Sequence, residues 1–466
     1  MISIKYRAEI ETKTLEYEYT ESVEDDDAEG QKEEVGKYPF IYINGVQIEN
    51  QSIKELKLFN NAMFPTLEMT FSDPTSVLLM NEFPVDDTIL SLYKRSTSDG
   101  LMDIKMDFKI TNFTTINGVS GDQVTFKLKA ILNIDELYLF NYESYDDTTY
   151  NILDELSKDM KLGFASNISN TNDKMKWINP GDYRQNFIGD IIKNSYIDDT
   201  TYLFGYIDFY YNFNYIDINK QLNEDISQQM AINSNERMNG TENEYPNEPL
   251  PLILTNNKDA ISTTMYISKY TINQDSTEIN IDTGYRYRYS AYNKTDDQYR
   301  RYMLDSISDS GKGIVLKGNP FTTDGILYEE SIGDEWMGKL DTYNVHENYL
   351  HSELQNKNNL KFLQKLKMTV KMGKPDYSLY RFQKLLVELY NFGKLEDSEE
   401  PHPELTPGSQ DENKTKIINY LSGEWIITAI NYTFTSKDST IQELTLVKRE
   451  MTEVYDFPRR EDKKTI

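Results

Sequence analysis

The segment Leu162–Leu222 constrains the fold more than any other part of this 466-residue chain. Within it, the run Ile207–Tyr215 carries an apolar or aromatic side chain at every second position, and mostly polar residues fill the others. A period of two predicts one long β-strand that is buried on one face. After this run the apolar positions change phase to Ile216 and Ile218, which predicts a β-bulge or a strand that passes from one sheet to another.

Residues 37–132 carry the pattern of a first β-domain. Asn44-Gly45 separates two short apolar runs, and this dipeptide favours the type I′ turn of a β-hairpin. Apolar and polar side chains then alternate in three further runs, 67–71, 104–110 and 124–130. Such alternation predicts antiparallel strands with one buried and one wet face, arranged as a small barrel or sandwich.

Residues 360–451 carry the pattern of a second β-domain. Apolar side chains alternate with lysines in Leu360–Val370, and Leu379–Phe392 is typical of a longer strand or a strand pair. The runs Trp425–Phe434 and Ile441–Lys448 predict a final hairpin. The two β-domains share no convincing sequence identity, so their similarity is one of architecture.

Helical periodicity lies between the two β-domains. We predict a first helix with Asp147 as its N-cap and Gly163 as its stop, from the spacing of Ile152, Leu153, Leu156 and Met160. A second predicted helix carries Phe187, Ile188, Ile191 and Ile192. Together these patterns predict an α+β fold that is predominantly antiparallel β.

Three polar segments interrupt these patterns. Residues 24–34 and 394–416 are acidic and poor in core-forming side chains. Residues 223–260 are rich in Asn and Glu and include three prolines. Segments of this composition bury little apolar surface, so we expect exposed loops or linkers, and we expect the two acidic segments to be dispensable for folding.

The charge balance is strongly acidic. The chain has 77 Asp and Glu against 49 Lys and Arg, a formal net charge of −28. Nucleic-acid binding needs clustered Lys and Arg, so this balance argues against a DNA-binding role. It is compatible with a pore that DNA crosses without sticking, and also with plain solubility. The 35 tyrosines suit wide subunit contacts or an ordinary Tyr-rich β core.

One cluster departs from this acidic background. Residues 285–303 interleave tyrosine with four arginines, which are Arg286, Arg288, Arg300 and Arg301. Arginine and tyrosine can stack on unpaired bases, which would make the cluster a nucleic-acid site. Both residue types are also enriched at protein interfaces, and we favour a protein contact here.

The histidines do not form a metal motif. His346 and His351 are five residues apart, about 140° around a helix, whereas the zinc-protease motif needs a spacing of four. The third histidine is His402. The chain has no cysteine, which excludes disulfides and thiolate metal sites, and it has no nucleophile elbow and no phosphate-binding glycine loop.

Paired carboxylates are the one catalytic chemistry that 77 acidic residues leave open. Asp334-Glu335-Trp336 is an acid–aromatic cluster of the kind found in sugar sites, but this composition produces such clusters by chance. We therefore predict no catalytic, cofactor or metal residues. The N-terminus lacks an apolar signal core and no run reaches the length of a membrane span, so we expect synthesis in the cytoplasm.

Three segments resemble the baseplate hub proteins of contractile-tailed phages, the tail tube-domain hub family. They are LGFASN at Leu162–Asn167, the run Trp177–Leu222, and LSGEWIITAINYTFTSKDSTIQELTLVKREM at Leu421–Met451. None of them is a catalytic motif, so the resemblance depends on their order and combination. Residues 20–36 and 275–345 have no counterpart in it.

The resemblance implies a division of the chain into five parts. These are a first tube-type β-barrel domain in 1–140, a helical segment with the long aromatic strand in 141–222, a mixed insertion domain in 223–359, a second tube-type β-barrel domain in 360–456, and a C-terminal tail in 457–466. Three chains would then supply six similar barrels to one ring.

The resemblance also implies a function and partners. Such a hub is a homotrimer that adapts the sixfold tail tube to the threefold cell-puncturing spike and lines the channel for DNA passage. Its partners would be a spike protein that bears a lysozyme, tail tube or tube-initiator proteins, and other baseplate proteins of the virion. We expect an acidic channel wall, because like charge keeps DNA from adhering. Two alternatives remain: the hub of a contractile injection or secretion system, and a virion-associated carbohydrate-degrading enzyme.

Overall fold

The computed structural model describes residues 2–13, 38–73, 78, 85–96, 101–116, 124–198, 200–224, 252–254, 267–274, 286–293, 298–305, 332–340, 345–346, 348–349, 352–353, 355–356, 363, 366–389, 421–435 and 439–448. In four of these ranges only the backbone is described, namely 252–254, 286–293, 298–305 and 332–340. The acidic segments 24–34 and 394–416, the tail 457–466, and His351 and His402 lie outside the described residues.

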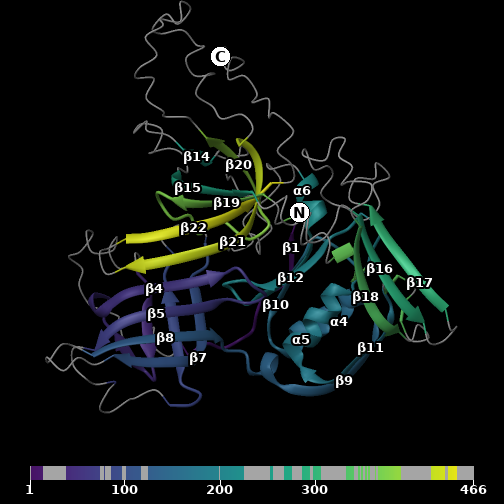
Figure 1. The fold of residues 1–466 in the computed structure, drawn as a ribbon. Coiled ribbons are helices and arrows are strands. Elements are labelled where there is room, and N and C mark those ends of the chain that lie inside the picture. Colours follow the sequence, from purple (N-terminus) through teal and green to yellow (C-terminus); the bar gives the residue numbers. More distant parts are fainter. Residues whose placement is uncertain are drawn as a thin grey trace, which may run out of the picture.

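Strands dominate the described chain, and most of them pair in antiparallel fashion (Figure 1). The predicted α+β fold with predominantly antiparallel β structure is confirmed. The α-helices that the structure describes from end to end lie in the middle of the sequence and are α4 (Thr149–Asp159), α5 (Arg184–Lys193) and α6 (Ile218–Asn223).

The largest sheet contains 13 of the described strands. The N-terminal ones are β2 (Phe40–Ile43), β3 (Val46–Ile48), β4 (Ile53–Asn60), β5 (Thr66–Asp73), β6 (Ile89–Lys94), β7 (Ile104–Ile116) and β8 (Val124–Leu132). The others are β14 (Leu252–Leu254), β15 (Ile267–Gln274), β19 (Leu366–Met372), β20 (Lys384–Leu389), β21 (Gly423–Thr435) and β22 (Ser439–Val447). The main path runs β15-β19-β22-β21-β4-β5-β8-β7-β6-β2-β3, and β20 branches from β21 to pair with β14.

Strands β4 and β21 join the two predicted β-domains. They pair antiparallel from Glu55–Thr435 to Asn60–Ile430, although they lie near opposite ends of the sequence. The result is one continuous, curled sheet (Figure 1). The N-terminal part of the sheet is the first β-region (β2–β8), and β19–β22 form the second β-region.

The strands predicted in the first β-region are confirmed. Leu67, Met69 and Phe71 of β5 are buried, as their alternation with polar residues requires. The hairpin between β2 and β3 has Asn44 at φ 49° and Gly45 at φ 80°. Both values are positive, as the predicted type I′ turn demands.

A second layer is built from the middle of the chain. Its four-stranded sheet has the order β1 (Ser3–Tyr6), β10 (Gly163–Ser166), β13 (Asn212–Asp217) and β12 (Leu203–Ile207). Helices α4 and α5 lie between this sheet and a two-stranded ribbon of β9 (Phe140–Asp147) and β11 (Met175–Tyr183) (Figure 1). A separate three-stranded sheet has the order β17 (Gln298–Asp305), β16 (Arg286–Asn293) and β18 (Ile332–Leu340).

The predicted long strand over Ile207–Tyr215 is wrong. The chain turns tightly after Ile207, with Tyr211 at φ 57°, and returns as β13, so that β12 and β13 form an antiparallel hairpin. Phe209 and Tyr211 lie in this turn and continue the alternation of apolar and polar residues from β12 into β13. The sequence pattern therefore gave no sign of the turn.

The predicted one-sided burial and the predicted bulge are also wrong. Every residue of β13 is buried, and the β12–β13 register is continuous. Phe213 and Tyr215 pack in the main core, whereas Ile216 packs on the opposite side, with Tyr206 and Phe382. The change of phase therefore marks a strand with two buried faces, and helix α6 begins directly after it.

The ends of the first helix differ from the prediction. Helix α4 ends at Asp159, and Lys161 adopts φ 55°, so the chain leaves the helix before Gly163. Gly163 begins β10 instead, where an added Cβ would clash with the side chain of Asn212. At the other end the N-cap position is Thr148 and not Asp147. The second predicted helix is confirmed as α5.

The second β-region contains its predicted final hairpin, β21–β22, with small shifts at the ends. The longer strand or strand pair predicted over Leu379–Phe392 is wrong. In the part of this run that the structure describes, 379–389, only β20 is a strand, and it is preceded by a turn in which Phe382 has φ 64°. The strand predicted from Leu360 begins at Leu366, as β19.

Candidate assembly site

The candidate site is the junction where both β-regions meet the β12–β13 hairpin. Arg381, in the turn before β20, is 3% exposed and reaches all three parts. Its Nη1 donates to Oδ1 of Asn60 at 3.2 Å and to the carbonyl of Ala62 at 2.6 Å, and its Nε donates to the carbonyl of Thr428 at 2.7 Å. One guanidinium thus ties the end of β4 to β21.

An aromatic ring of the hairpin completes this junction. The ring of Tyr206 lies 4.6 Å from the guanidinium carbon of Arg381, and its hydroxyl donates to the Arg381 carbonyl at 3.1 Å. Burial lowers the pKa of Arg381 to about 10, so the group stays charged at neutral pH. Its hydrogen-bond acceptors are neutral, and the π face of Tyr206 stabilises the buried charge.

Two buried carboxylates hold the hairpin itself. Oδ1 of Asp208 accepts from the backbone N–H groups of Tyr210 at 2.8 Å and Asn212 at 2.9 Å, which closes the turn. Oδ1 of Asp217 accepts from the N–H of Tyr202 at 3.0 Å and from the N–H of Asn219 at 2.9 Å, the N-cap contact of α6.

Burial acts on both of these carboxylates. It raises the pKa of Asp208, and it raises the pKa of Asp217 to about 6, although backbone N–H donors oppose the shift in each case. Raised pKa values in a cleft can indicate catalysis. Here both carboxylates accept hydrogen bonds from backbone N–H groups inside the fold, so their role is structural.

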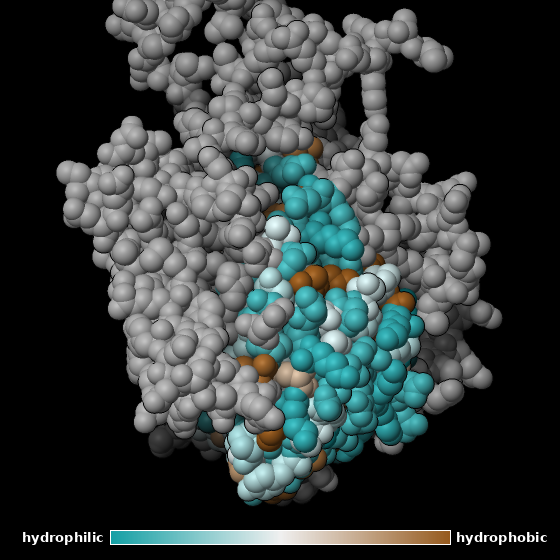
Figure 2. All heavy atoms as spheres, turned by 90° about the vertical axis from the view of Figure 1, so that its right-hand side faces the viewer, coloured by the Kyte–Doolittle hydropathy of each residue, from teal (hydrophilic) through white to brown (hydrophobic). Residues whose placement is uncertain are grey.

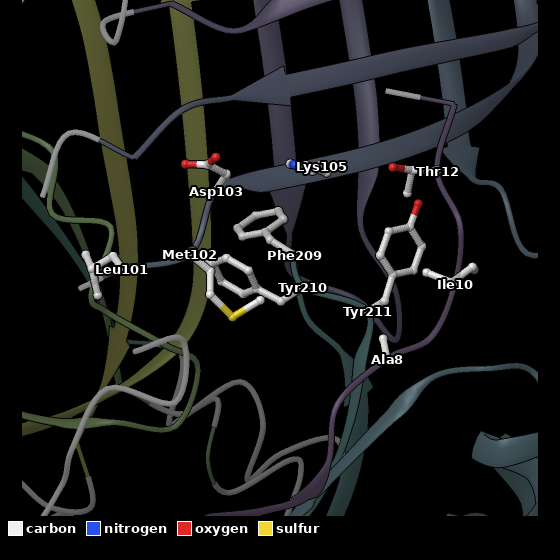
Figure 3. A pocket seen from close by; sticks show the side chains of 10 residues that line it. All are labelled: Ala8, Ile10, Thr12, Leu101, Met102, Asp103, Lys105, Phe209, Tyr210 and Tyr211. Atoms are coloured by element: carbon white, nitrogen blue, oxygen red, sulfur yellow. The ribbon is translucent and has the colours of Figure 1, made fainter. Parts of the chain in front are cut away.

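A recess of about 380 Å³ opens beside the hairpin turn (Figure 3). Its walls come from three segments: Ala8–Thr12 after β1, Leu101–Lys105 before and in β7, and the turn Phe209–Tyr211. Asp103 already accepts from the Tyr93 hydroxyl at 3.1 Å and from a backbone N–H. The recess is suited to receiving a side chain, and no nucleophile–base pair lines it.

The wet face of the first β-region carries charges of both signs. Nζ of Lys57 lies 3.0 Å from Glu55, and Nζ of Lys129 lies 2.7 Å from Glu68. These residues line a shallow recess of about 230 Å³ together with Lys127. Despite the net charge of −28, this face is not predominantly acidic.

His346, whose spacing from His351 argued against a zinc motif, has a structural place. His346 is buried, and its Nε2 lies 3.1 Å from the carbonyl oxygen of Asn194, to which it donates. Its ring lies beside the rings of Trp177 and Tyr349. Within the described residues, no three His, Cys, Asp or Glu side chains gather as a metal ion would require.

The arginine cluster and the acid–aromatic cluster belong to one sheet. Arg286 and Arg288 lie on β16, and Arg300 and Arg301 lie on β17. In the parallel β16–β18 pair, Arg288 is in register with Asp334, and Tyr289 with Glu335. The two clusters, which are far apart in sequence, thus occupy adjacent strands, and acidic positions neighbour the basic ones.

The sequence reasoning missed Arg381, Asp208 and Asp217 as the groups that hold the junction. A usable signal existed for the two carboxylates, because each lies between two apolar neighbours in the sequence, Asp208 between Ile207 and Phe209 and Asp217 between Ile216 and Ile218. No local signal marks Arg381, whose hydrogen-bond partners are Asn60, Ala62 and Thr428.

None of the described helices is long and apolar enough to span a bilayer.

Comparison with known proteins places this fold. The sequence matches no protein-family model. It is not measurably similar to any curated protein. Among solved structures, the tail protein from Neisseria meningitidis MC58 matches with a TM-score of 0.50 and 9% identity, over 90% of this chain and 99% of that one. The 43 kDa tail protein of prophage MuSo2 from Shewanella oneidensis matches with a TM-score of 0.50 and 8% identity, over 88% of this chain and 98% of that one.

A third structure, the E. coli c3393 protein, described as a component of the type VI secretion system, matches with a TM-score of 0.38 and 10% identity, over 90% of this chain and 80% of that one. The first two likenesses span nearly the whole of each tail protein. The chain therefore shares its fold with these two tail proteins, one of which comes from a prophage.

Proposed function

We propose that this chain is the structural hub of a tail baseplate, a subunit of the ring between a tail tube and a cell-puncturing spike. The observation that carries the proposal is the likeness in fold to two tail proteins over nearly their whole length. The chemistry of the interior agrees with it, because the buried charged groups Arg381, Asp208 and Asp217 serve the fold.

The symmetry of the ring follows from the two β-regions. One chain presents two of them side by side, joined at β4 and β21. Three chains then supply six, which satisfies a sixfold tube and a threefold spike together. The contact would run from the first β-region of one copy to the second β-region of the next, a heterologous interface that closes after three repeats.

Open strand edges give this ring a physical rationale. The path of the large sheet ends at β3 and at β15, so it does not close on itself among the described strands. An exposed edge is prone to pairing with other chains, and ring closure would cover such edges. The division into tube domains at 1–140 and 360–456 is part of this proposal.

The proposed place is the tail of a virion, with a spike protein on one side of the ring and tube or tube-initiator proteins on the other. DNA would leave through the channel without binding to it. Because the wet face of β4, β5 and β8 carries Lys57 and Lys129 beside its glutamates, we expect other surfaces to supply the acidic channel wall.

The test is the mass of the purified protein in solution, measured by mass photometry or light scattering. We expect a particle with three times the 54.5 kDa mass of the chain. A zymogram on the same preparation should show no degradation of peptidoglycan or polysaccharide. A stable twofold dimer, or hydrolytic activity that copurifies with the chain, would overturn the proposal.

A further inference from the structure

The β9–β11 ribbon presents its aromatic side chains to solvent instead of to a core. Tyr142 is 77% exposed, Phe140 55% and Ile178 56%. The ring of Phe140 makes edge-to-face contacts with Tyr142 and with Tyr183, at centroid distances of 5.8 and 5.9 Å. Brown and white spheres gather at the lower end of the described face in Figure 2, on the side where Figure 1 places β9. Contiguous exposed apolar groups of this kind mark interaction sites.

The opposite face of the ribbon fixes which side chains point outward. Glu143 forms an ion pair with Arg184 of α5, and both side chains are nearly buried. Tyr145 stacks on Phe187 of α5, and Trp177 is buried. A shift of one residue would expose these groups, so the register is strongly specified. The outward position of Phe140 and Tyr142 is therefore built into the fold.

The two edges of the ribbon differ. Among the described strands, β9 and β11 pair only with each other. The β11 edge contains Pro180, which has no N–H, and a bulge at Gly181, whose φ is 107°. Both features are devices that block further strand pairing. The β9 edge, Phe140–Asp147, has neither proline nor glycine, and every second residue directs its N–H and C=O away from β11.

Along β9 itself the charge has one sign, while the exposed Lys176 lies on the partner strand β11, in register with Asp146. The segment from Ile131 to Ser157 contains seven acidic residues and no Lys or Arg. Arg184, the cation underneath, is already paired with Glu143. A second copy of this ribbon would bring two acidic rims together, which is unfavourable, whereas a partner with lysine or arginine would be attracted.

We propose that the β9 edge accepts an added β-strand from another protein, an extended segment that alternates apolar residues with lysine or arginine. Backbone hydrogen bonds along Phe140–Asp147 would supply affinity, and the apolar side chains would pack on Phe140 and Tyr142. The basic residues would complement the acidic rim. The inference requires only the ribbon as it stands, so it is independent of the hub assignment.

The first experiment uses a synthetic peptide of about ten residues that alternates valine with lysine, a typical strand length. Its binding to the full chain is measured by fluorescence anisotropy, and the contact is located by hydrogen–deuterium exchange. We expect binding with slower exchange at amides within Asn141–Asp147. A peptide that alternates valine with glutamate, and a valine–lysine peptide N-methylated at alternate residues, should each bind at least about tenfold more weakly.

The second experiment uses variants of the full chain. Phe140→Ser with Tyr142→Ser should weaken the valine–lysine peptide about tenfold and leave the melting temperature unchanged, because both side chains are exposed. Val85→Ser is the matched control, since Val85 is 73% exposed but lies outside the ribbon, and it should leave binding unchanged.

Several results would overturn the inference. These are no measurable binding of the valine–lysine peptide, equal binding of the N-methylated peptide, or exchange protection that maps away from β9. Self-association of the chain that Tyr142→Ser abolishes would assign the surface to a second copy instead. A failure here leaves the mass of the assembled ring unaffected, so it is distinguishable from a failure of the hub proposal.

Discussion

The β12–β13 hairpin and the β9–β11 ribbon are both two-stranded, antiparallel and rich in aromatic residues, yet their environments are opposite. Tyr206 and Tyr215 of the hairpin are 0% exposed, whereas Tyr142 of the ribbon is 77% exposed. The hairpin satisfies its own backbone with Asp208 and Asp217 and can therefore be buried on both faces.

The ribbon places its polar groups differently. Glu143 faces inward to Arg184, so the aromatic residues of β9 are left on the outer face. Alternation of aromatic residues, which both elements share, therefore does not by itself predict which face of a strand is buried. The position of the polar partners decides it, and this distinction can be tested by matched substitutions in the two elements.

The largest expected effect is the difference between the same substitution at two tyrosines. Tyr206→Ala removes a fully buried ring and its contact with Arg381, and should lower the free energy of unfolding by about 3–5 kcal/mol. Tyr142→Ala should change it by no more than about 0.5 kcal/mol. Chemical denaturation of both variants measures the contrast, and equal losses would show that the ribbon is part of a core.

The next effect concerns the group that ties the hairpin to the large sheet. Arg381→Met should lower the free energy of unfolding by about 2–4 kcal/mol, because the acceptors at Asn60, Ala62 and Thr428 lose a buried donor. Lys176→Met, an exposed position on the ribbon, is the matched control and should stay within about 0.5 kcal/mol. A neutral result at Arg381 would mean that water replaces the guanidinium.

A third, smaller effect depends on pH. The pKa of Asp217 is raised from 3.8 to about 6 in the folded chain, so the folded chain holds this proton more tightly than the unfolded chain. The contribution of Asp217 to stability is therefore greatest below about pH 4, and it falls as pH rises to about 6, by up to about 3 kcal/mol.

Asp217→Asn removes the loss of stability with rising pH, because the amide does not ionise. It retains an oxygen that can accept from the N–H groups of Tyr202 and Asn219. The variant should match the wild type near pH 4 and exceed it by about 1–2 kcal/mol near pH 8. Thermal melts at the two pH values measure the difference. A variant that is less stable than the wild type at both values would show that the buried charge itself is required.

The smallest expected effect is at the acid–aromatic cluster. Asp334→Ala with Glu335→Ala should leave the oligomeric mass unchanged, because β18 belongs to the three-stranded sheet and not to the large sheet that the junction joins. The same double variant in a zymogram separates structure from catalysis. Hydrolysis by the wild type that the double change abolishes would make β18 a catalytic strand.

Much of the large sheet could be predicted from the sequence. Strands with one solvent-exposed face can be recognised in the sequence, because polar residues must occupy every second position, as in β5 and β8. The Asn44-Gly45 turn was equally predictable, since few dipeptides tolerate two positive φ values. Local chemistry determines both features.

The junction could not be predicted in the same way. Its hairpin is buried on both faces, so alternation of polar and apolar residues does not show which face packs against the main core. Two of the hydrogen-bond acceptors of Arg381 lie hundreds of positions away, at Asn60 and Ala62, and no local pattern couples them to it. The β4–β21 pairing has the same origin, since only the folded chain brings Asn60 beside Ile430.

The most direct measurement is a cryo-electron microscopy map of the purified, assembled protein. The account predicts a threefold ring with six similar β-regions around a channel, in which the first β-region of each copy contacts the second of the next. A particle with twofold symmetry, or a ring to which each chain contributes only one of its two β-regions, would contradict it.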